Sequence, residues 1–362
     1  MNGINNIKFT DVVLGASFGD ECKGSCAYDL LKTNSHNLCI KFNGGPNAGN
    51  TIYIKSEEKT TEEATATEAS TYKKMVLHML PIGMAKSDVY NLISSDCVID
   101  IEKLKKELDY VKSYGIDITG RIFISKACHI ITQENIDFDR QNNLVGTTCS
   151  GIAPTYSNKM LRIGKRVEDY VAEFEAMGVQ VIDMRKFWTS DFVINNIKGV
   201  LLQGSQGFEL DINWCGHYPY CTSSTCTLGG AVNTGFPLKS LRNIYGIAKI
   251  YDTYVGSMKF QPPDDEDLVK IAEHGHEFGS TTGRRRQCNY LNLDALKEGL
   301  IINNCNKCII NKVDIVADLG IFKLYHKGEL KTFNVLDDML NFILQELNFV
   351  GEVIFSSSPY KI

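Results

Sequence analysis

Residues 9–33 read FTDVVLGASFGDECKGSCAYDLLKT and contain the strongest indication of the fold class. Its first part, residues 9–14, is a short apolar run that predicts a β-strand. Gly15 and Gly19 then interrupt the run, and residues 26–33 have the composition of a helix. A strand, a glycine-bearing turn and a helix in this order form the opening unit of an α/β protein.

Apolar runs and amphipathic segments alternate along the rest of the chain. Further strands are expected at residues 37–42, 121–124, 179–184, 193–202, 308–316 and 352–355. Helices are expected at residues 101–114, 167–177, 241–251 and 336–347. Strands that alternate with helices favour a large, mostly parallel central sheet that is flanked by helices. We therefore predict an α/β, P-loop-NTPase-like single domain that spans residues 1–362.

One segment departs from this pattern. Residues 56–73 read SEEKTTEEATATEASTYK and contain almost no large apolar side chain. Such a composition cannot bury enough apolar surface to form a core. We interpret residues 56–73 as a mobile surface insertion without a catalytic role.

Composition and charge exclude several classes of function. The 362 residues carry a formal net charge of -5 with a pI near 5.9, whereas a nucleic-acid footprint needs a basic face. The sequence contains no run of 18 apolar residues, which a membrane span would need. It also has no apolar segment near its start of the kind found in a signal peptide. We therefore expect a cytoplasmic protein, in which the 12 cysteines remain thiols.

The turn at residues 19–24, GDECKG, follows a strand and opens a helix. Such a turn presents backbone N–H groups and a helix N-terminus to a phosphate, and Lys23 adds a positive charge. The turn lacks the GxxxxGK[ST] pattern of a Walker A motif. Asp20 and Glu21 would repel a phosphate unless they bind a metal, accept a proton or cap the helix.

A second glycine-rich turn, GGPNAGNT, occupies residues 44–51. Taken together, GDECKG and GGPNAGNT resemble the adenylosuccinate synthetase family. Five further segments agree in order and spacing, so the resemblance spans nearly the whole chain. These segments are LHMLP at 77–81, VGTTCSGIAPTY at 145–156, GSQG at 204–207, YPYCTSS at 218–224 and EFGSTTGRRR at 277–286.

The resemblance implies a GTP-dependent ligase that makes adenylosuccinate from IMP and L-aspartate. In such enzymes GTP phosphorylates O6 of IMP, and the amine of aspartate then displaces that phosphate. The matching catalytic positions are Asp20, Lys23, Asn50 and Gln206. Asp20 would be the general base and, with the backbone of Gly49, would hold Mg²⁺. Positioning and charge neutralisation dominate the catalysis of such transfers.

The resemblance also assigns residues to each substrate. The IMP-binding positions are Asn47, Thr148, Arg162, Gln206 and Thr222. The aspartate-binding positions are Thr281, Thr282 and Arg284. The GTP-binding positions are Gly19, Glu21, Cys22, Gly24, Thr51, Arg286, Lys312, Asp314, Ser356 and Ser358. The family lends an arginine at the position of Arg162 to its partner's IMP site, which implies a homodimer with a shared active site.

Asp314 has a physical rationale of its own. It lies in NKVD, residues 311–314, at the polar end of an apolar strand, where α/β sheets bind ligands. A carboxylate can accept hydrogen bonds from N1–H and the 2-amino group of guanine. Because adenine lacks this pair of donors, Asp314 indicates GTP.

One departure from the family pattern leaves the function open. The family has a histidine where this chain has Asn50, and an amide can donate a hydrogen bond but carries no charge at neutral pH. A working adenylosuccinate synthetase is the first hypothesis. A phage-type enzyme that uses dGMP is the second, although such enzymes replace the aspartate that this chain retains as Asp20. A nucleotide-binding pseudoenzyme with a regulatory role is the third.

Overall fold

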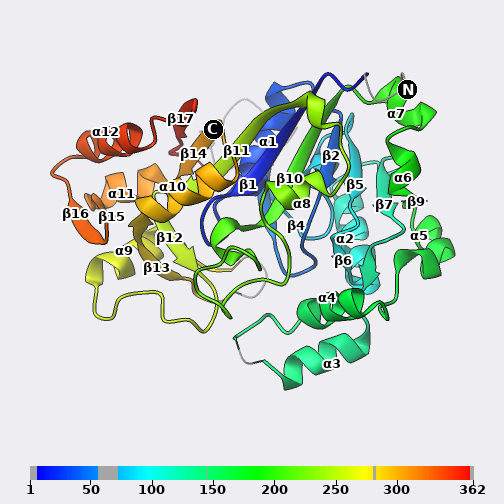
Figure 1. The fold of residues 1–362 in the computed structure, drawn as a ribbon, viewed down its shortest axis with the longest axis horizontal. Helices are drawn as coiled ribbons and strands as arrows, with labels where there is room; N and C mark the ends of the chain where they lie inside the picture. The colour runs from blue at the N-terminus through cyan, green and yellow to red at the C-terminus, as the bar shows by residue number, and fades with distance from the viewer. Residues whose placement is uncertain (1–5, 56–71, 144, 280–282, 359–362) are drawn as a thin grey trace, which may run out of the picture.

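The computed structural model describes residues 6–55, 72–143, 145–279 and 283–358. A nine-stranded sheet in the order β17-β14-β11-β1-β10-β2-β5-β7-β9 runs through its centre, and every neighbouring pair is parallel. The sheet and its flanking helices are seen in Figure 1. Its strands are β1 (Phe9–Gly15), β2 (Leu38–Lys41), β5 (Tyr90–Ile93), β7 (Ile122–Ser125), β9 (Gln180–Ile182), β10 (Gly199–Gly207), β11 (Leu241–Lys249), β14 (Lys307–Asn311) and β17 (Glu352–Phe355).

Helices cover both faces of this sheet, as the sequence predicted. They are α1 (Lys23–Thr33), α2 (Ile101–Ser113), α3 (Gln133–Gln141), α4 (Ile152–Leu161), α5 (Val171–Ala176), α6 (Met184–Phe187), α7 (Asp191–Asn196), α8 (Leu228–Val232), α9 (Glu266–His274), α10 (Leu293–Ile302), α11 (Val313–Leu319) and α12 (Leu336–Glu346). In the described part of the chain, no helix has the length and apolar character needed to span a bilayer.

Side chains of β1 alternate between two hydrophobic cores. Val12 and Leu14 pack into one core with α10 and α12, whereas Val13 packs into the other with α1 and α2. Successive side chains of a strand point to opposite faces, so a central strand must be apolar on both. The continuous apolar run of β1 is therefore the signature of a strand buried between two layers of helices.

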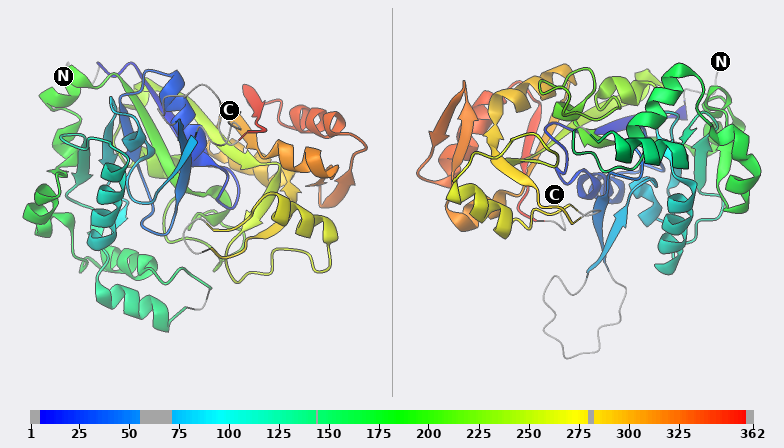
Figure 2. Two further views of the ribbon diagram at one scale, coloured as in Figure 1. Left: turned by 180° about the vertical axis from the view of Figure 1, so that it is seen from behind. Right: turned by 90° about the horizontal axis from the view of Figure 1, so that it is seen from below.

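Smaller sheets flank the central one. A four-stranded sheet in the order β12-β13-β15-β16 comprises β12 (Tyr251–Tyr254), β13 (Gln287–Asn292), β15 (Lys323–His326) and β16 (Glu329–Thr332). An antiparallel hairpin comprises β3 (Asn50–Lys55) and β4 (Tyr72–Leu77), and it projects from the body in Figure 2. The pair β6 (Val98–Ile99) and β8 (His129–Ile130) is parallel. Most of the predicted insertion at 56–73 lies outside the described residues.

The prediction of a helix at residues 241–251 was wrong. This stretch forms β11, which pairs with β1 and β14, and β12 begins at Tyr251. A fully buried parallel strand and a buried helix are both continuous apolar runs, so periodicity does not separate them. In the folded chain β11 packs closely against α10, because a Cβ on Gly246 would lie 2.2 Å from Leu300 Cδ2.

Two predicted strands were too long. Residues 193–202 begin within α7, whose cap Ser190 accepts a hydrogen bond from the Val193 N–H, and only then enter β10. In residues 308–316, β14 ends at Asn311 and α11 begins at Val313. Lys312 between them has a φ of 66°, which turns the chain out of the strand.

Candidate active site at the carboxyl ends of the central strands

The first glycine-rich turn connects β1 to α1 and is stabilised by the side chain of Glu21, one of its own residues. The Glu21 carboxylate accepts the N–H groups of Ser17 at 3.2 Å and Gly19 at 2.7 Å. Its other oxygen lies 2.5 Å from Lys23 Nζ, and Glu21 is almost completely buried. Glu21 therefore pairs with Lys23 and fixes the shape of the turn, while Asp20, with a φ of 58°, lies on its outer side.

The second glycine-rich turn packs tightly against β10. Gly44 has a φ of 87°, and a Cβ there would lie 2.7 Å from the Ser205 side chain. Asn43 ties the two segments together, because its Oδ1 accepts the Ser205 N–H and its carbonyl accepts the Ser205 hydroxyl. The turn ends at Asn50, which approaches the N-terminus of α1: a Cβ on Gly24 would lie 3.0 Å from Asn50 Cβ.

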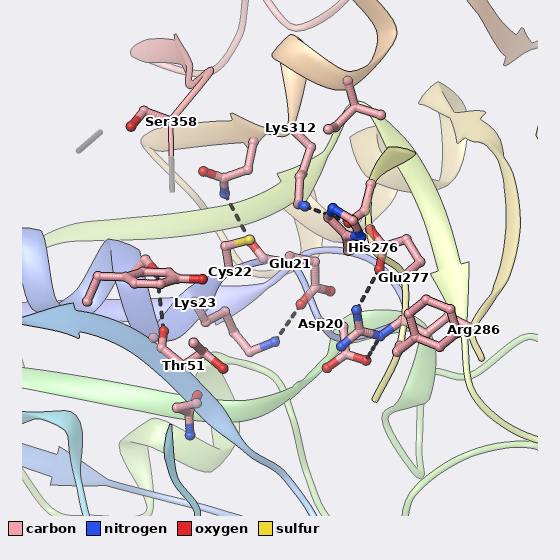
Figure 3. A pocket seen from close by; sticks show the side chains of 18 of the residues that line it. Asp20, Glu21, Cys22, Lys23, Thr51, His276, Glu277, Arg286, Lys312 and Ser358 are labelled. Carbon is pink, nitrogen blue, oxygen red and sulfur yellow. Dashed lines mark hydrogen bonds and ion pairs between the residues drawn. The ribbon is translucent and has the colours of Figure 1, made fainter. Parts of the chain in front are cut away.

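Both turns line one cavity of about 540 Å³, the size of a small-molecule site. Many of the residues predicted from the sequence surround it, and several are seen in Figure 3. They are Asp20, Glu21, Cys22, Lys23, Gly24, Gly49, Asn50, Thr51, Arg286, Lys312, Asp314 and Ser358. The carboxyl ends of β1, β10 and β14 meet at this cavity, which is where parallel sheets bind ligands.

Three amide side chains near this cavity carry a buried polar atom that has no partner among the described residues. These atoms are Asn47 Oδ1, Asn50 Nδ2 and Gln206 Nε2. The opposite atom of Gln206, Oε1, accepts a hydrogen bond from Asn43 Nδ2 at 3.3 Å. Because buried polar atoms are paired in folded proteins, these three atoms indicate a polar ligand.

A network of charges crosses the cavity near Asp20. Arg286 donates from Nε to Asp20 Oδ2 and from Nη1 to Glu277 Oε2, each at 2.6 Å (Figure 3). Glu277 also accepts from Tyr251 Oη at 2.7 Å and from Lys249 Nζ at 3.2 Å. Burial opposes ionisation of Glu277, but the positive charges of Lys249 and Arg286 outweigh it and lower its pKa to about 2. Glu277 is therefore an anion at neutral pH.

The far end of the cavity is formed by β14 and α11. Asn311 Nδ2 donates to the Glu21 carbonyl at 2.9 Å and so joins this end to the first turn. Lys312 Nζ donates to the Gly275 carbonyl at 2.9 Å. Asp314 is half-buried in the first turn of α11, and burial raises the pKa of its carboxyl group. Ser356 accepts the Val313 N–H at 3.2 Å through its carbonyl.

Other predicted residues lie around the cavity rather than in its lining. Arg284 donates to the carbonyls of Gly256 at 3.0 Å and Gly146 at 3.5 Å, and so connects its loop to the loop that carries Thr148. The N–H of Thr222 donates to the Leu210 carbonyl at 2.8 Å. Thr281 and Thr282 lie outside the described residues.

Arg162 lies at the exposed C-terminal cap of α4, where its φ is 64°. Met160, Leu161 and Ile163 beside it are 73%, 62% and 69% exposed. Several large apolar side chains exposed together are typical of a protein–protein interface. The structure therefore places Arg162 on an apolar surface and not within the described cavity.

Sequence reasoning missed Lys249, Tyr251 and Glu277. Glu277 belongs to EFGSTTGRRR, one of the motifs that carry the family resemblance, but the resemblance assigns roles only to hydroxyl and arginine residues of that motif. Lys249 and Tyr251 lie within residues 241–251, for which the sequence pattern predicts a helix. Assignment of residues 241–249 as a strand places Lys249 at the carboxyl end of a central strand. This position is the feature of the sequence that could have identified Lys249 as a site residue.

Two buried carboxyl groups lie behind the first turn. The N–H of Glu209 donates to the Ser17 carbonyl at 3.0 Å. Burial raises the pKa of Glu209 to about 7, and the charge of Asp252 acts in the same direction. Burial likewise raises the pKa of Asp252 to about 6. Because the folded protein binds these protons more tightly than the unfolded chain, their stabilisation is complete below about pH 4 and is lost as the pH rises through 6 and 7.

Glu209→Gln is therefore expected to raise the free energy of unfolding at pH 8 by about 1–3 kcal/mol, with a much smaller change at pH 5. Urea denaturation at the two pH values measures this difference. Glu329→Gln, on exposed β16, is the control and should change neither value. Equal effects of Glu209→Gln at both pH values would contradict the assignment.

Comparison with known proteins connects this geometry to a family. A sequence model of the family described as adenylosuccinate synthetase matches residues 12–193 and 172–332. The adenylosuccinate synthetase of Komagataella phaffii is 32% identical over 89% of this chain and 83% of its own length. That of Alcanivorax borkumensis is 34% identical over 85% and 78%.

The chain belongs to the adenylosuccinate synthetase family. Members of this family are GTP-dependent ligases, so the resemblance and the enzyme class predicted from the sequence are confirmed. Among solved structures, a fully ligated adenylosuccinate synthetase from Plasmodium falciparum has a TM-score of 0.80 at 24% identity, and the match covers 98% of each chain.

A second solved structure belongs to a phage. Succinoaminodeoxyadenylate synthetase of cyanophage S-2L, bound to dGMP and to dATP as an energy donor, has a TM-score of 0.73 at 19% identity. That match covers 98% of this chain and 94% of the other. At these identities the two solved structures support the adenylosuccinate synthetase fold alone, and they confirm the predicted α/β architecture.

Proposed function

We propose that the protein joins IMP and L-aspartate to form adenylosuccinate, with GTP as the phosphoryl donor. The observation that carries this proposal is the single cavity that both glycine-rich turns share with Asp314. Asp20, Lys23 and Asn50 line it together with Asp314, whose carboxylate would bind guanine. These groups suit a nucleoside triphosphate whose phosphates lie at the turns and whose base lies at α11.

In the first step, O6 of IMP attacks the γ-phosphorus of GTP, and GDP leaves. Asp20 takes the N1 proton of IMP, and a general base of this kind contributes about 10²–10⁴-fold to a rate. Lys23, at the N-terminus of α1, neutralises charge on the transferring phosphoryl group. In the second step, the amine of aspartate attacks C6 and releases a proton, and phosphate leaves with its bonding electrons.

Asn50 would act in this first step as a neutral donor. Its Nδ2 is buried and has no partner within the described part of the chain, so it is available to a phosphate oxygen. An amide supplies a hydrogen bond without a change of charge. We infer that Asn50 performs the role of the family's histidine, and that it does so through a hydrogen bond alone.

Binding of the other substrates follows from the remaining groups. Asn47 and Gln206 have opposite unpaired atoms, an acceptor and a donor, which suit the edge of a purine. Thr148 and Thr222 lie on loops near Arg284 and the first turn, and these loops would hold the ribose and phosphate of IMP. Arg284, with Thr281 and Thr282, would bind the carboxylates of aspartate, because arginine pairs with carboxylates in a bidentate manner.

Mg²⁺ fits the donors that the cavity offers. Among residues 6–55, 72–143, 145–279 and 283–358, no group of three or more His, Cys, Asp or Glu side chains is arranged to hold a metal. Mg²⁺ does not need such a group, since it keeps several waters and binds one or two protein oxygens together with phosphates. Asp20 and the backbone of Gly49 line the same cavity and would hold the ion. When bound, the metal would neutralise charge on the phosphates.

Turnover with IMP and with dGMP, measured in parallel, tests the proposed function. Phosphate release and product mass would be followed with GTP, Mg²⁺ and aspartate present. We expect activity on IMP, with dGMP much poorer, because Asp20 is retained. Activity mainly on dGMP would assign the chain to the phage-type reaction, and GTP binding without turnover of either nucleotide would favour a pseudoenzyme.

A homodimer in the cytoplasm completes the proposal. Arg162 and its exposed apolar neighbours would face the partner subunit, and Arg162 would reach the partner's IMP phosphate. Arg162→Leu is then expected to raise the KM for IMP about 10-fold or more, as the loss of a charge-assisted contact would. Arg185→Leu, on α6, is the control. An unchanged KM for IMP, or a monomeric protein with full activity, would contradict the shared site.

A further inference from the structure

Four charged side chains form a connected network of ion pairs at the first turn. Lys249 and Arg286 are the cations, and Asp20 and Glu277 are the anions, so the set is neutral. Glu277 is its centre, because it pairs with both cations and accepts a hydrogen bond from the Tyr251 hydroxyl. These groups come from the first turn (Asp20), the end of β11 (Lys249), the start of β12 (Tyr251), the segment after α9 (Glu277) and the segment before β13 (Arg286).

Glu277 is more deeply buried than Asp20, the proposed general base on the other side of Arg286. The side chain of Glu277 is 1% exposed, whereas that of Asp20 is 35% exposed. A buried carboxylate with three partners is held in one orientation, and its loss leaves the buried cations without compensation. Asp20 instead lies at the open side of the cavity, where a substrate can reach it.

The guanidinium group of Arg286 connects the two acids. Its Nη1 binds Glu277 Oε2 and its Nε binds Asp20 Oδ2, each at 2.6 Å. The backbone adds a further restraint, since the Arg286 N–H donates to the Glu277 carbonyl at 3.0 Å. A planar guanidinium held at two nitrogens has little freedom to rotate. The orientation of Glu277 is therefore transmitted to Asp20.

We infer that Glu277 is a positioning residue for the reaction, which holds Arg286 so that Arg286 engages one oxygen of Asp20 and keeps that carboxylate aimed into the cavity. This inference rests on the proposed function, in which Asp20 is the general base. With a neutral residue at position 277, Arg286 would turn toward Asp20 and pair with both of its oxygens. Asp20 would then be less available to the substrate proton.

Glu277→Gln tests this role with little change in shape. We expect kcat to fall about 10- to 100-fold, with a smaller change in the KM for GTP, because Asp314 and the first turn remain in place. GTP binding measured by calorimetry should stay within a few fold of the wild-type value. Glu277→Asp, which keeps the charge, should recover part of the lost kcat.

A double-mutant cycle separates positioning from general structural support. Glu277→Gln is combined with Arg286→Gln, and kcat is compared for the two single variants and the double variant. If Glu277 acts through Arg286, the double variant should lose little more than Arg286→Gln alone. Additive losses in the cycle would overturn the inference.

Asp11→Asn is the matched control. Asp11 is a fully buried carboxylate that pairs with Arg242 and His36, and it does not line the cavity. Its replacement should lower thermal stability while kcat stays within about twofold of the wild-type value. An inactive wild-type protein would count against the proposed function, whereas an active wild type with an unchanged Glu277→Gln kcat would overturn this inference alone.

Discussion

Asp20→Ala is expected to lower kcat by about 10²–10⁴-fold, the range of a lost general base. Steady-state turnover with IMP, GTP and aspartate measures this loss. Binding of GTP should persist, because Lys23, Asp314 and the N-terminus of α1 remain. The effect should appear in kcat rather than in the KM for IMP, since Asp20 accepts a proton only as the phosphoryl group transfers.

The contacts of Asp20 explain why so large an effect is expected. Positive φ values at Gly19, Asp20 and Cys22 bend the turn so that Asp20 leaves the β1 direction and lies at the cavity. Glu21, the neighbouring acid, is already engaged by Ser17, Gly19 and Lys23. Glu21 is thus committed to the turn, and it would not replace the lost base.

Asp20→Asn refines this experiment, because it keeps the shape and removes the ability to accept a proton. It should be nearly as inactive as Asp20→Ala. Asp109→Ala, at an exposed position of α2, is the control and should retain wild-type turnover. Substantial activity of Asp20→Asn would remove Asp20 as the base and leave it at most a role in binding.

Asp314→Asn is expected to reduce the preference for GTP over ATP by about 10- to 100-fold, mainly through the KM for GTP. The carboxylate offers two acceptors to N1–H and the 2-amino group of guanine. An amide offers one acceptor and places its NH₂ group against a guanine donor. A buried donor left without a partner costs about 1–3 kcal/mol, which gives the expected range.

Competition assays with GTP and ATP measure this change in preference. Asp338→Asn, also in the first turn of a helix, is the matched control and should leave the nucleotide preference unchanged. The half-buried position of Asp314 in the cavity supports the expectation, because a fully solvated carboxylate would discriminate less. An unaltered ratio for Asp314→Asn would remove the assignment of the guanine site.

Local sequence patterns predicted the parts of the site that are local in the structure. The conformation of the first turn depends on local contacts, since Glu21 binds both Gly19 and Lys23 within a few residues. The parallel sheet also followed from the alternation of strands and helices. Glu277 did not, because its partners Lys249 and Tyr251 are 28 and 26 residues away and meet it only in the folded protein.

The error at residues 241–251 has the same origin. A strand enclosed on both faces has no polar side to mark its period, and its identity depends on the neighbours β1 and β14. The orientation of Arg286 is a further example, since it reaches across 266 residues to Asp20. Such contacts arise from the assembly of the sheet and leave no signal within a short window.

The strand order also has a consequence for how the chain folds. β1 lies between β10 and β11, so the first strand of the sheet pairs only with segments made near the middle of the chain. Contacts between residues far apart in the sequence slow folding. The entropy of closing the long loop is lost before the contacts that compensate for it can form. Asp314, in α11, is synthesised later than β10 and β11. We therefore expect a nascent chain to acquire nucleotide affinity only after most of it has emerged, so that GTP would act as a folding ligand that stabilises the completed sheet.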